Sequence, residues 1–290
     1  MLIKQLKYKQ IDKQKWDKTI SLAKNSLPYA FSWFLDAVSE DWEALIAGDY
    51  EYVMPLPLKK KLGIKYVVQP MYCQQLGIFS QEIINQDIVN EFVKAIPYQY
   101  FTLQLNSQNF SENKKDNLIL PLSNDYEKIK QNFSENTKRN IRKSEKFGLK
   151  VKIIEPTDFL NFWKSKNFEK YPHVFSVLEK IANLQNNFVK LYTVVNQQNE
   201  IIATNLMLET EKRIINLSPT SNAEGKEKSA MFFLLNYLIE KNAEKDMILD
   251  FEGSQIQGVA RFYRGFGAEN EPYFCIKKNK FKWLIKLIRL

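Results

Sequence analysis

The sequence predicts a mixed α/β protein made of two similar domains. The chain has 290 residues, which is long for one domain and comfortable for two. Stretches of alternating apolar residues, typical of strands, are interspersed with stretches whose apolar residues recur at helical spacing. The order of these stretches is nearly the same on both sides of a basic segment at 125–148, which predicts two domains of one architecture.

The first domain is expected over residues 1–124, in the order strand, two helices, three strands, helix and strand, followed by a further short strand. Trp16, Ile20 and Ala23 show the helical spacing of its first helix. Gly48 and Asp49 predict a hairpin turn between two strands. The expected helices are 12–25, 31–39 and 83–96, and the expected strands are 2–8, 42–48, 50–61, 63–79, 98–106 and 117–122, with a polar connector at 109–117.

The segment 125–148 is expected to form two helices that connect the domains. Ser134 is placed to cap the second helix, and Gly148 to end it. One side of this helix is a basic ridge, formed by Lys138, Arg139, Arg142, Lys143 and Lys146. The ridge has two interpretations, a solvated linker helix or a clamp in which arginine forks bind phosphate or diphosphate. Nucleic acid would also suit the ridge, but no zinc-finger, RNP-type or helix-turn-helix pattern accompanies it.

The second domain is expected over residues 149–290 and repeats the order of the first. Its expected helices are 157–170, 173–187 and 230–245, and its expected strands are 148–155, 187–196, 201–210, 213–221, 247–252 and 272–278, with a loop at 222–229.

The stretch 247–269 carries the strongest signal of a functional site. Its strand bears Asp250 and Glu252, which alternation places on one face. After the break at Gly253 and Ser254, a short helix is expected. It places Arg261, Tyr263 and Arg264 just beyond the strand.

The composition narrows the partners and excludes several kinds of site. The net charge of +9 is concentrated at 138–152 and 277–290, which suggests an anionic partner. The chain has one histidine, His173, and two cysteines far apart, Cys73 and Cys275, so a Ser-His-Asp triad is not expected and a histidine-rich metal site is excluded. No P-loop or Rossmann glycine pattern is present.

The sequence also bears on location. No stretch approaches the roughly 20 apolar residues that span a bilayer. No apolar run follows the N-terminus, so a cytoplasmic protein without a cleaved signal is expected. The tail 279–290 has apolar and basic faces when drawn as a helix. It is interpreted either as a helix docked on the body or as shallow contact with an anionic membrane at the inner face.

Three motifs resemble the GNAT superfamily, and among its members the FemAB-like, Fem-type aminoacyltransferases. They are YVMPLPL with QPMYCQQLGIF, then SENTKRNIRKSEKFGLKV, and then LDFEGSQIQGVARFYRGFGAENEPY. The resemblance covers nearly the whole chain. It implies two tandem GNAT-like domains, each a mixed, mostly antiparallel sheet flanked by helices, whose strands splay to admit an acyl donor.

The resemblance implies an acyl donor that is either acyl-CoA or aminoacyl-tRNA, with no tightly bound cofactor and no metal. Many GNAT enzymes that use acetyl-CoA hold its pyrophosphate in a glycine-rich turn at a helix start. Here the corresponding loop is NAEGKEKSA, with the single glycine Gly225. Lys226, Lys228 and Ser229 are still placed to meet a phosphate, and the two donors remain open.

Acyl transfer to an amine requires a base, a stabilised oxyanion and a proton for the leaving group. Glu252 or Asp250 is the candidate base and Tyr263 the candidate proton donor. Each also has a structural interpretation, as an ion-pair partner or an interface aromatic. The candidate substrate-binding residues are Arg261, Arg264, Arg139, Arg142, Lys143, Lys226, Lys228, Ser229, Asn205 and Ser218.

These observations predict an acyltransferase that acylates an amine of a phosphate-bearing or lipid-linked acceptor, such as a cell-envelope precursor. The alternative is a catalytically divergent protein of the same fold that binds an anionic ligand, nucleic acid or a membrane surface.

Overall fold

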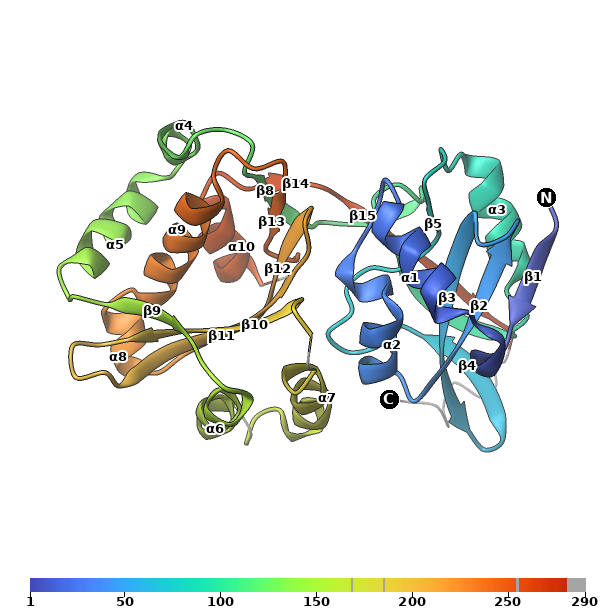
Figure 1. The fold of residues 1–290 in the computed structure, drawn as a ribbon, viewed down its shortest axis with the longest axis horizontal. Helices are drawn as coiled ribbons and strands as arrows, with labels where there is room; N and C mark the ends of the chain where they lie inside the picture. Colours follow the sequence, from blue (N-terminus) through green and yellow to red (C-terminus); the bar gives the residue numbers. More distant parts are fainter. Residues whose placement is uncertain (168, 185, 254–255, 281–290) are drawn as a thin grey trace. The chain divides into compact units, whose positions relative to one another are not determined.

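The computed structural model describes residues 1–167, 169–184, 186–253 and 256–280 (Figure 1). The chain divides into two compact units. Unit 1 contains residues 1–115 and the segment from 272 onward, and unit 2 contains residues 116–271. The division differs from the boundaries expected at 124 and 149, because the basic helices pack within unit 2 and the last strand joins unit 1.

Unit 1 is built on a sheet whose strands follow the order β1-β2-β3-β4-β6-β15-β7, with β5 paired to β3. The strands are β1 (Ile3–Leu6), β2 (Asp41–Ala47), β3 (Tyr52–Lys61), β4 (Ile64–Val68), β5 (Phe79–Ser80), β6 (Tyr100–Leu105), β7 (Asn113–Lys115) and β15 (Tyr273–Asn279). The short strand β7 lies inside the segment that we expected to be a polar connector, and that expectation was wrong there.

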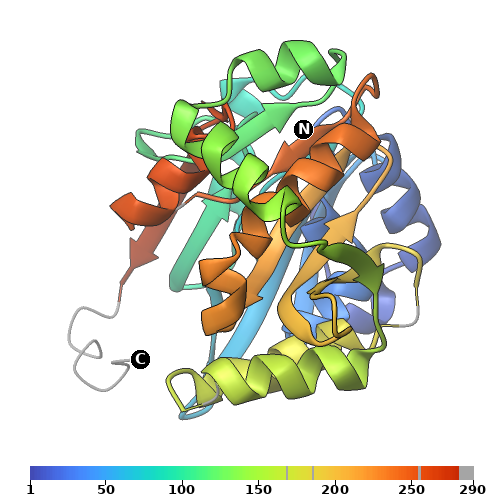
Figure 2. The ribbon, with the colours of Figure 1, turned by 90° about the vertical axis from the view of Figure 1, so that its left-hand side faces the viewer.

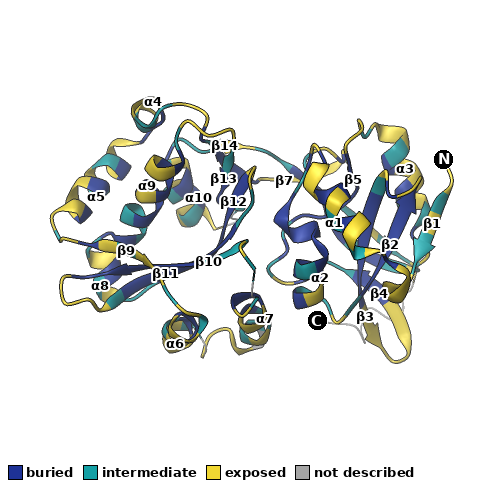
Figure 3. Cartoon of the chain, in the orientation of Figure 1, coloured by how far each residue is buried: buried dark blue, intermediate teal, exposed yellow. Residues whose placement is uncertain are grey.

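Helices cover both faces of this sheet (Figures 1 and 3). They are α1 (Lys13–Leu22), α2 (Ser32–Val38) and α3 (Gln86–Ala95), with short 3-10 turns η1 (Tyr8–Gln10) and η2 (Pro28–Ala30). Successive residues of β2 point to opposite faces, so Trp42 packs on Trp16 of α1 while Leu45 joins the core under α3. Asn85 caps α3 by accepting a hydrogen bond from the Ile88 amide at 3.0 Å.

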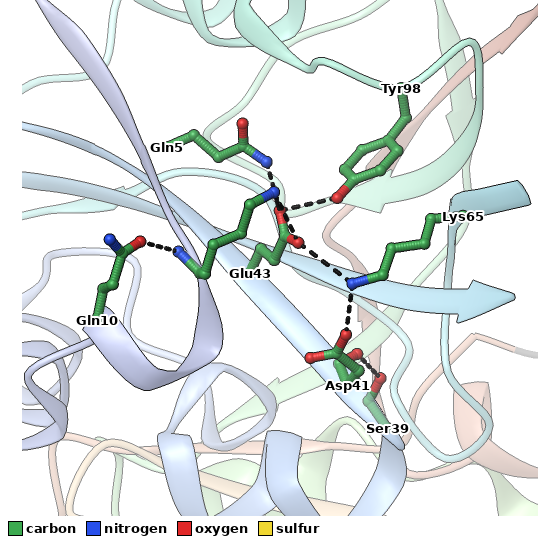
Figure 4. A network of polar contacts seen from close by, with 8 residues as sticks. Gln5, Gln10, Ser39, Asp41, Glu43, Lys65 and Tyr98 are labelled. Carbon is green, nitrogen blue, oxygen red and sulfur yellow. Dashed lines mark hydrogen bonds and ion pairs between the residues drawn. The ribbon is translucent and has the colours of Figure 1, made fainter.

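A buried carboxylate ties four segments of unit 1 together (Figure 4). Glu43 of β2 is 1% exposed and accepts hydrogen bonds from Lys7 at 2.9 Å, Tyr98 at 2.8 Å and Gln5. Lys65 of β4 lies 3.6 Å away. Burial pushes the pKa of Glu43 upward, but the hydrogen bonds outweigh it, so this pKa lies below its ordinary value.

Unit 2 is built on a second sheet, in the order β14-β8-β13-β12-β11-β10-β9. Its strands are β8 (Leu118–Pro121), β9 (Lys150–Ile153), β10 (Val189–Val195), β11 (Ile201–Glu209), β12 (Arg213–Ser221), β13 (Ile248–Asp250) and β14 (Glu269–Asn270). Its helices are α4 (Tyr126–Gln131), α5 (Glu135–Glu145), α6 (Pro156–Asn167), α7 (Pro172–Ala182), α8 (Ala223–Glu227), α9 (Ala230–Asn242) and α10 (Gln257–Arg264).

The core of unit 2 lies between its sheet and helices α5, α9 and α10, while α6 and α7 lie on the other face (Figures 1 and 2). Ser134 caps α5 as predicted, accepting a hydrogen bond from the Thr137 amide at 3.2 Å. Ile141 of α5 joins the core formed by Leu234 and Leu238 of α9. The segment 222–229 was expected to be a loop, but most of it forms α8, which Asn222 caps by accepting from the Gly225 amide at 2.7 Å.

Read from β9, the sheet of unit 2 has the same strand order as the sheet of unit 1 read from β1. Each sheet also contains one strand that we expected in the other domain. β8 follows β7 of unit 1 in the chain and joins the sheet of unit 2, where it pairs with β13. β15 follows β14 of unit 2 and joins the sheet of unit 1, where it pairs with β6. The expected assignment of 117–122 to the first domain and of 272–278 to the second was therefore wrong.

Some predictions lie outside the described residues. They are the predicted break at Ser254, the predicted helix of the tail from 281 onward, and the role of the His173 side chain. In the described part of the chain, no helix is long and apolar enough to cross a membrane.

Candidate functional site

The central feature of unit 2 is the point where β12 and β13 separate. The two strands are parallel and pair only from Arg213 to Ile215 of β12. Beyond Ile215, the described residues offer β12 no strand partner on that side. A β-bulge follows directly, because Asn216 and Ser218 pair with successive residues of β11 and leave Leu217 between them. Bulges are common next to active sites, where they change the direction in which a side chain points.

A chain of polar side chains crosses the sheet at this separation. Asn205 of β11 donates a hydrogen bond to Oδ1 of Asn216 at 2.6 Å, and Nδ2 of Asn216 donates to the Tyr263 hydroxyl at 2.8 Å. All three side chains are buried. Since the Tyr263 oxygen accepts from Asn216, its own proton is left to donate, and no acceptor for it is found among the described residues.

The surroundings of Tyr263 keep its phenol protonated. Its ring stacks on Phe251, with ring centroids 4.7 Å apart and an angle of 16° between the rings. Burial raises the pKa of Tyr263 well above its ordinary value, and the negative charge of Glu252 raises it further, while the hydrogen bond from Asn216 acts in the opposite direction. Tyr263 therefore carries its proton at physiological pH.

Asp250 and Glu252 do not share a strand face as we predicted. β13 ends at Asp250, and Glu252 follows in the left-handed region with φ 56°. Oδ1 of Asp250 accepts a hydrogen bond from the Glu252 amide at 2.9 Å, which holds this turn. Glu252 is half-buried, whereas Asp250 is fully buried.

Asp250 forms a buried ion pair that the sequence interpretation missed. Arg213 donates to Oδ2 of Asp250 at 2.5 Å and to both carboxylate oxygens of Glu271 at 3.0 to 3.1 Å. Both oxygens of Asp250 are thus occupied. Asp250 is thus an ion-pair partner, the structural interpretation that the sequence left open, and the arginine that pairs with it stands at the start of β12.

Gly253 is fixed by close packing. A Cβ at this position would lie 1.8 Å from the carbonyl oxygen of Asp116. Any side chain would therefore push the loop after β13 away from the start of β8.

Arg261 and Arg264 lie on another face of α10. With residues at the start of α5 and with Phe232 and Phe262, they line an open groove of about 710 Å³. The rings of these two phenylalanines meet edge to face at 4.6 Å. Arg264 lies 3.7 Å from Asp116, while Arg261 is exposed and has no ion-pair partner among the described residues. Guanidinium groups and aromatic rings in the lining of one groove suit an anionic group attached to a planar or apolar body.

The basic ridge of α5 extends from this groove. Arg139 donates to the Asn136 side chain at 2.8 Å, and Asn136 lines the groove. Arg142 and Lys143 follow on the exposed side of the helix. The ridge therefore lies on the surface, while Thr137, Ile141 and Ser144 face the core.

The junction of α8 and α9 adjoins the same helix (Figure 2). The Ser229 hydroxyl donates to Asn140 of α5 at 2.8 Å, and Lys228 pairs with Glu224 at 2.7 Å. Lys226 is exposed. A Cβ on Gly225 would lie 2.2 Å from the Ile202 carbonyl oxygen, so this glycine allows α8 to pack on β11.

The predicted site residues thus form two groups. Tyr263 and Asn205 meet through Asn216 at the separated strands, with Glu252 close enough for its charge to act on Tyr263, and the buried Ser218 two residues further along β12. The arginines and lysines lie around the groove, α5 and the α8–α9 junction.

Sequence reasoning missed Asn216 and Arg213, although both stand in the first half of the predicted strand 213–221. Polar residues in an apolar strand were the available signal. In the part of the chain that the structure describes, no cluster of three metal-ligating side chains is present.

Comparison with known proteins shows what fold this is. No family model and no curated protein matches the sequence. Among solved structures, FemX superposes with a TM-score of 0.70 at 13% identity, with 100% of both chains covered. The C-terminal domain of a putative lysylphosphatidylglycerol synthetase from Agrobacterium fabrum has a TM-score of 0.59 at 11% identity, covering 96% of this chain and 95% of that one. A tandem GNAT protein from the clavulanic acid pathway has a TM-score of 0.53 at 8% identity, covering 95% and 98%.

These likenesses span nearly the full chain and confirm the predicted fold class. The chain has the FemAB-like fold, with two tandem GNAT-type units.

Proposed function

We propose that this protein is an acyltransferase, which transfers an acyl or aminoacyl group to an amine on a phosphate-bearing or lipid-linked acceptor. The observation that carries the proposal is the Tyr263 hydroxyl, held by Asn216 where β12 and β13 separate, with its proton free to donate. One fold neighbour is named a putative lysylphosphatidylglycerol synthetase. The product in that name consists of an amino acid and a phospholipid, which supports a lipid-linked acceptor.

The chemistry assigned to the separated strands is a single displacement. The acceptor amine attacks the acyl carbonyl and loses a proton to Glu252, directly or through water, as the new N–C bond forms. Tyr263 donates its proton to the leaving atom of the donor as the old acyl bond breaks. The proton on Glu252 then returns to the phenolate. Asp250 positions Glu252 through its amide and takes no part in proton transfer.

The cationic surface of unit 2 is assigned to the phosphates of the donor. Arg261 and Arg264 at the groove and Arg139, Arg142 and Lys143 along α5 are all exposed, so each can meet a phosphate of a polyanion. α8 fills the loop where a glycine-rich turn would hold a pyrophosphate, and Lys228 is already paired there. These features favour aminoacyl-tRNA over acyl-CoA as the donor.

The test of the reaction is Tyr263→Phe, assayed by product formation with panels of both donors and amine acceptors. The ring stacking on Phe251 is retained, so the variant removes only the hydroxyl. We expect kcat to fall about 10²- to 10⁴-fold with little change in KM. The control is Tyr192→Phe, because Tyr192 is a buried tyrosine of the same unit whose hydroxyl donates to Glu209 at 2.8 Å. Equal activity of the two variants would refute the assignment.

The donor is tested separately by binding. Aminoacyl-tRNA should raise the melting temperature and bind with a steep salt dependence, and Arg261→Gln should weaken it. If coenzyme A thioesters produce the larger shift, and Lys226→Gln rather than Arg261→Gln removes it, the donor assignment is wrong while the reaction class stands.

A further inference from the structure

The hairpin between β3 and β4 in unit 1 has an unusual tip. Lys61 pairs with Ile64, so the loop consists of two residues, Leu62 and Gly63. Both have positive φ, 51° and 80°, as a type I′ turn requires. Asparagine, aspartate and glycine suit the first of these positions, because a leucine in the left-handed region is strained. Asparagine, aspartate or glycine at position 62 would therefore make the hairpin more stable than Leu62 does.

Leu62 is not placed there by packing. Its side chain is 73% exposed, and Ile64 beside it is 37% exposed. Figure 3 shows the tip of this hairpin as exposed on both strands. Two exposed aliphatic side chains at a strained tip contribute nothing to the core of unit 1, which leaves them available for a contact outside the chain.

The charged residues of the hairpin itself are all lysines. Lys59, Lys60 and Lys61 are exposed and form no ion pair within the described residues, whereas Lys65 is paired with Asp41 at 2.9 Å. β6 runs parallel to β4, so its first residues lie at the hairpin end of the sheet. β15 is antiparallel to β6 and brings Lys278 and Lys280 to that end, where the Lys280 amide donates to the Gln99 carbonyl at 3.0 Å.

We propose that this hairpin is a membrane-contact element, in which Leu62 and Ile64 enter the interface of an anionic bilayer while Lys59, Lys60 and Lys61 meet lipid head groups. Aliphatic side chains gain free energy by leaving water, and lysines near an anionic surface add electrostatic attraction. A nucleic acid would also attract the lysines, but an aliphatic tip gives bases nothing to stack on. The element lies in unit 1 and is independent of the reaction proposed for unit 2.

The test is co-sedimentation of the full chain with vesicles of phosphatidylglycerol and phosphatidylcholine, compared with phosphatidylcholine alone. Leu62→Asn should weaken binding to the anionic vesicles about tenfold. The triple variant Lys59→Gln, Lys60→Gln, Lys61→Gln should weaken it about fivefold per lysine, and salt should do the same to the wild type. The control is Ile83→Asn, since Ile83 is 76% exposed in the same unit but lies near Glu82 and Asp87.

Loss of folding cannot mimic the expected result, because Leu62→Asn removes backbone strain and should raise the melting temperature. The proposal is overturned if Leu62→Asn binds anionic vesicles as the wild type does, or if Ile83→Asn loses as much affinity. It is equally overturned if the lysine variant loses affinity for tRNA but keeps its affinity for vesicles, which would make the hairpin a nucleic-acid contact.

Discussion

Two carboxylates that look interchangeable in the sequence have different surroundings in the structure. Asp250 is fully buried, and both of its oxygens are taken, by Arg213 and by the Glu252 amide. Glu252 stands in a strained turn near the Tyr263 phenol, where its charge raises the pKa of that phenol. Strained backbone at such a position is typical of functional sites, so Glu252 is the better candidate for the base.

Substitutions at these two positions should separate stability from turnover. Asp250→Asn should lower the free energy of unfolding by about 1–3 kcal/mol, because Arg213 loses its buried charged partner and keeps only Glu271. Its folded fraction should keep turnover within about tenfold of the wild type. Glu252→Gln should change stability little and lower kcat about a hundredfold. Urea unfolding and initial rates on the same samples give both quantities.

The reverse pattern, with turnover lost in Asp250→Asn and retained in Glu252→Gln, would make Asp250 the base. It would also require its ion pair with Arg213 to open during the reaction.

At the scale of elements, β2 shows how one side chain can join several segments. Glu43 lies on the face of β2 that otherwise carries Leu45 and Ala47 into the core. A carboxylate at such a place is costly unless it is hydrogen-bonded, and Gln5, Lys7 and Tyr98 satisfy it. The network therefore connects β1, β2 and the segment before β6.

The stability that Glu43 contributes should depend on pH. Its pKa is lowered in the folded state from the ordinary value of 4.5, so the contribution is present above that value and is lost as the pH falls through the folded pKa. Glu43→Gln should therefore lower the free energy of unfolding by about 1–3 kcal/mol at pH 7. The difference from the wild type should shrink as the pH falls below about 4.

Urea unfolding at several pH values measures this effect. Asp49→Asn is the control, since Asp49 is an exposed partner of Lys15 and its removal should change little. A difference between Glu43→Gln and the wild type that grows toward low pH would contradict the assigned direction of the pKa shift.

At the scale of the whole molecule, the two units differ in how the chain supplies the strands of their sheets. All strands of the unit 2 sheet lie within residues 116–271, whereas the unit 1 sheet needs β15 from the far end of the chain. β15 brings Phe274 into the core of unit 1 and covers the edge of β6. Unit 1 is therefore incomplete without residues beyond 271.

Fragments should show this inequality. Residues 116–271 should unfold cooperatively on their own. Residues 1–115 should not, because β6 would be left as an open edge beside an incomplete core. Adding residues 272–280 as a separate peptide should restore protected amides in β6, measured by hydrogen exchange. A fragment 1–115 that unfolds cooperatively without this peptide would show that β15 is dispensable.

Much of the fold follows from local patterns in the sequence. Apolar periodicity located most helices and strands of both units, and Ser134 acts as the predicted cap. These features depend on neighbours along the chain, which a sequence displays directly. The same reasoning missed β7 and α8, because three-residue strands and one-turn helices carry too little periodicity.

The sequence by itself determined the architecture of two similar α/β units, the basic helix and the segment that carries Tyr263. Only the tertiary structure decided which strands belong to which sheet, because edge pairing depends on contacts between residues far apart in the chain. It also decided that Arg213 pairs with Asp250 and that Asn216 holds Tyr263. Hydrogen bonds across separated strands leave no periodic trace in a sequence, so the partners of a buried polar group become known only when the sheet is assembled.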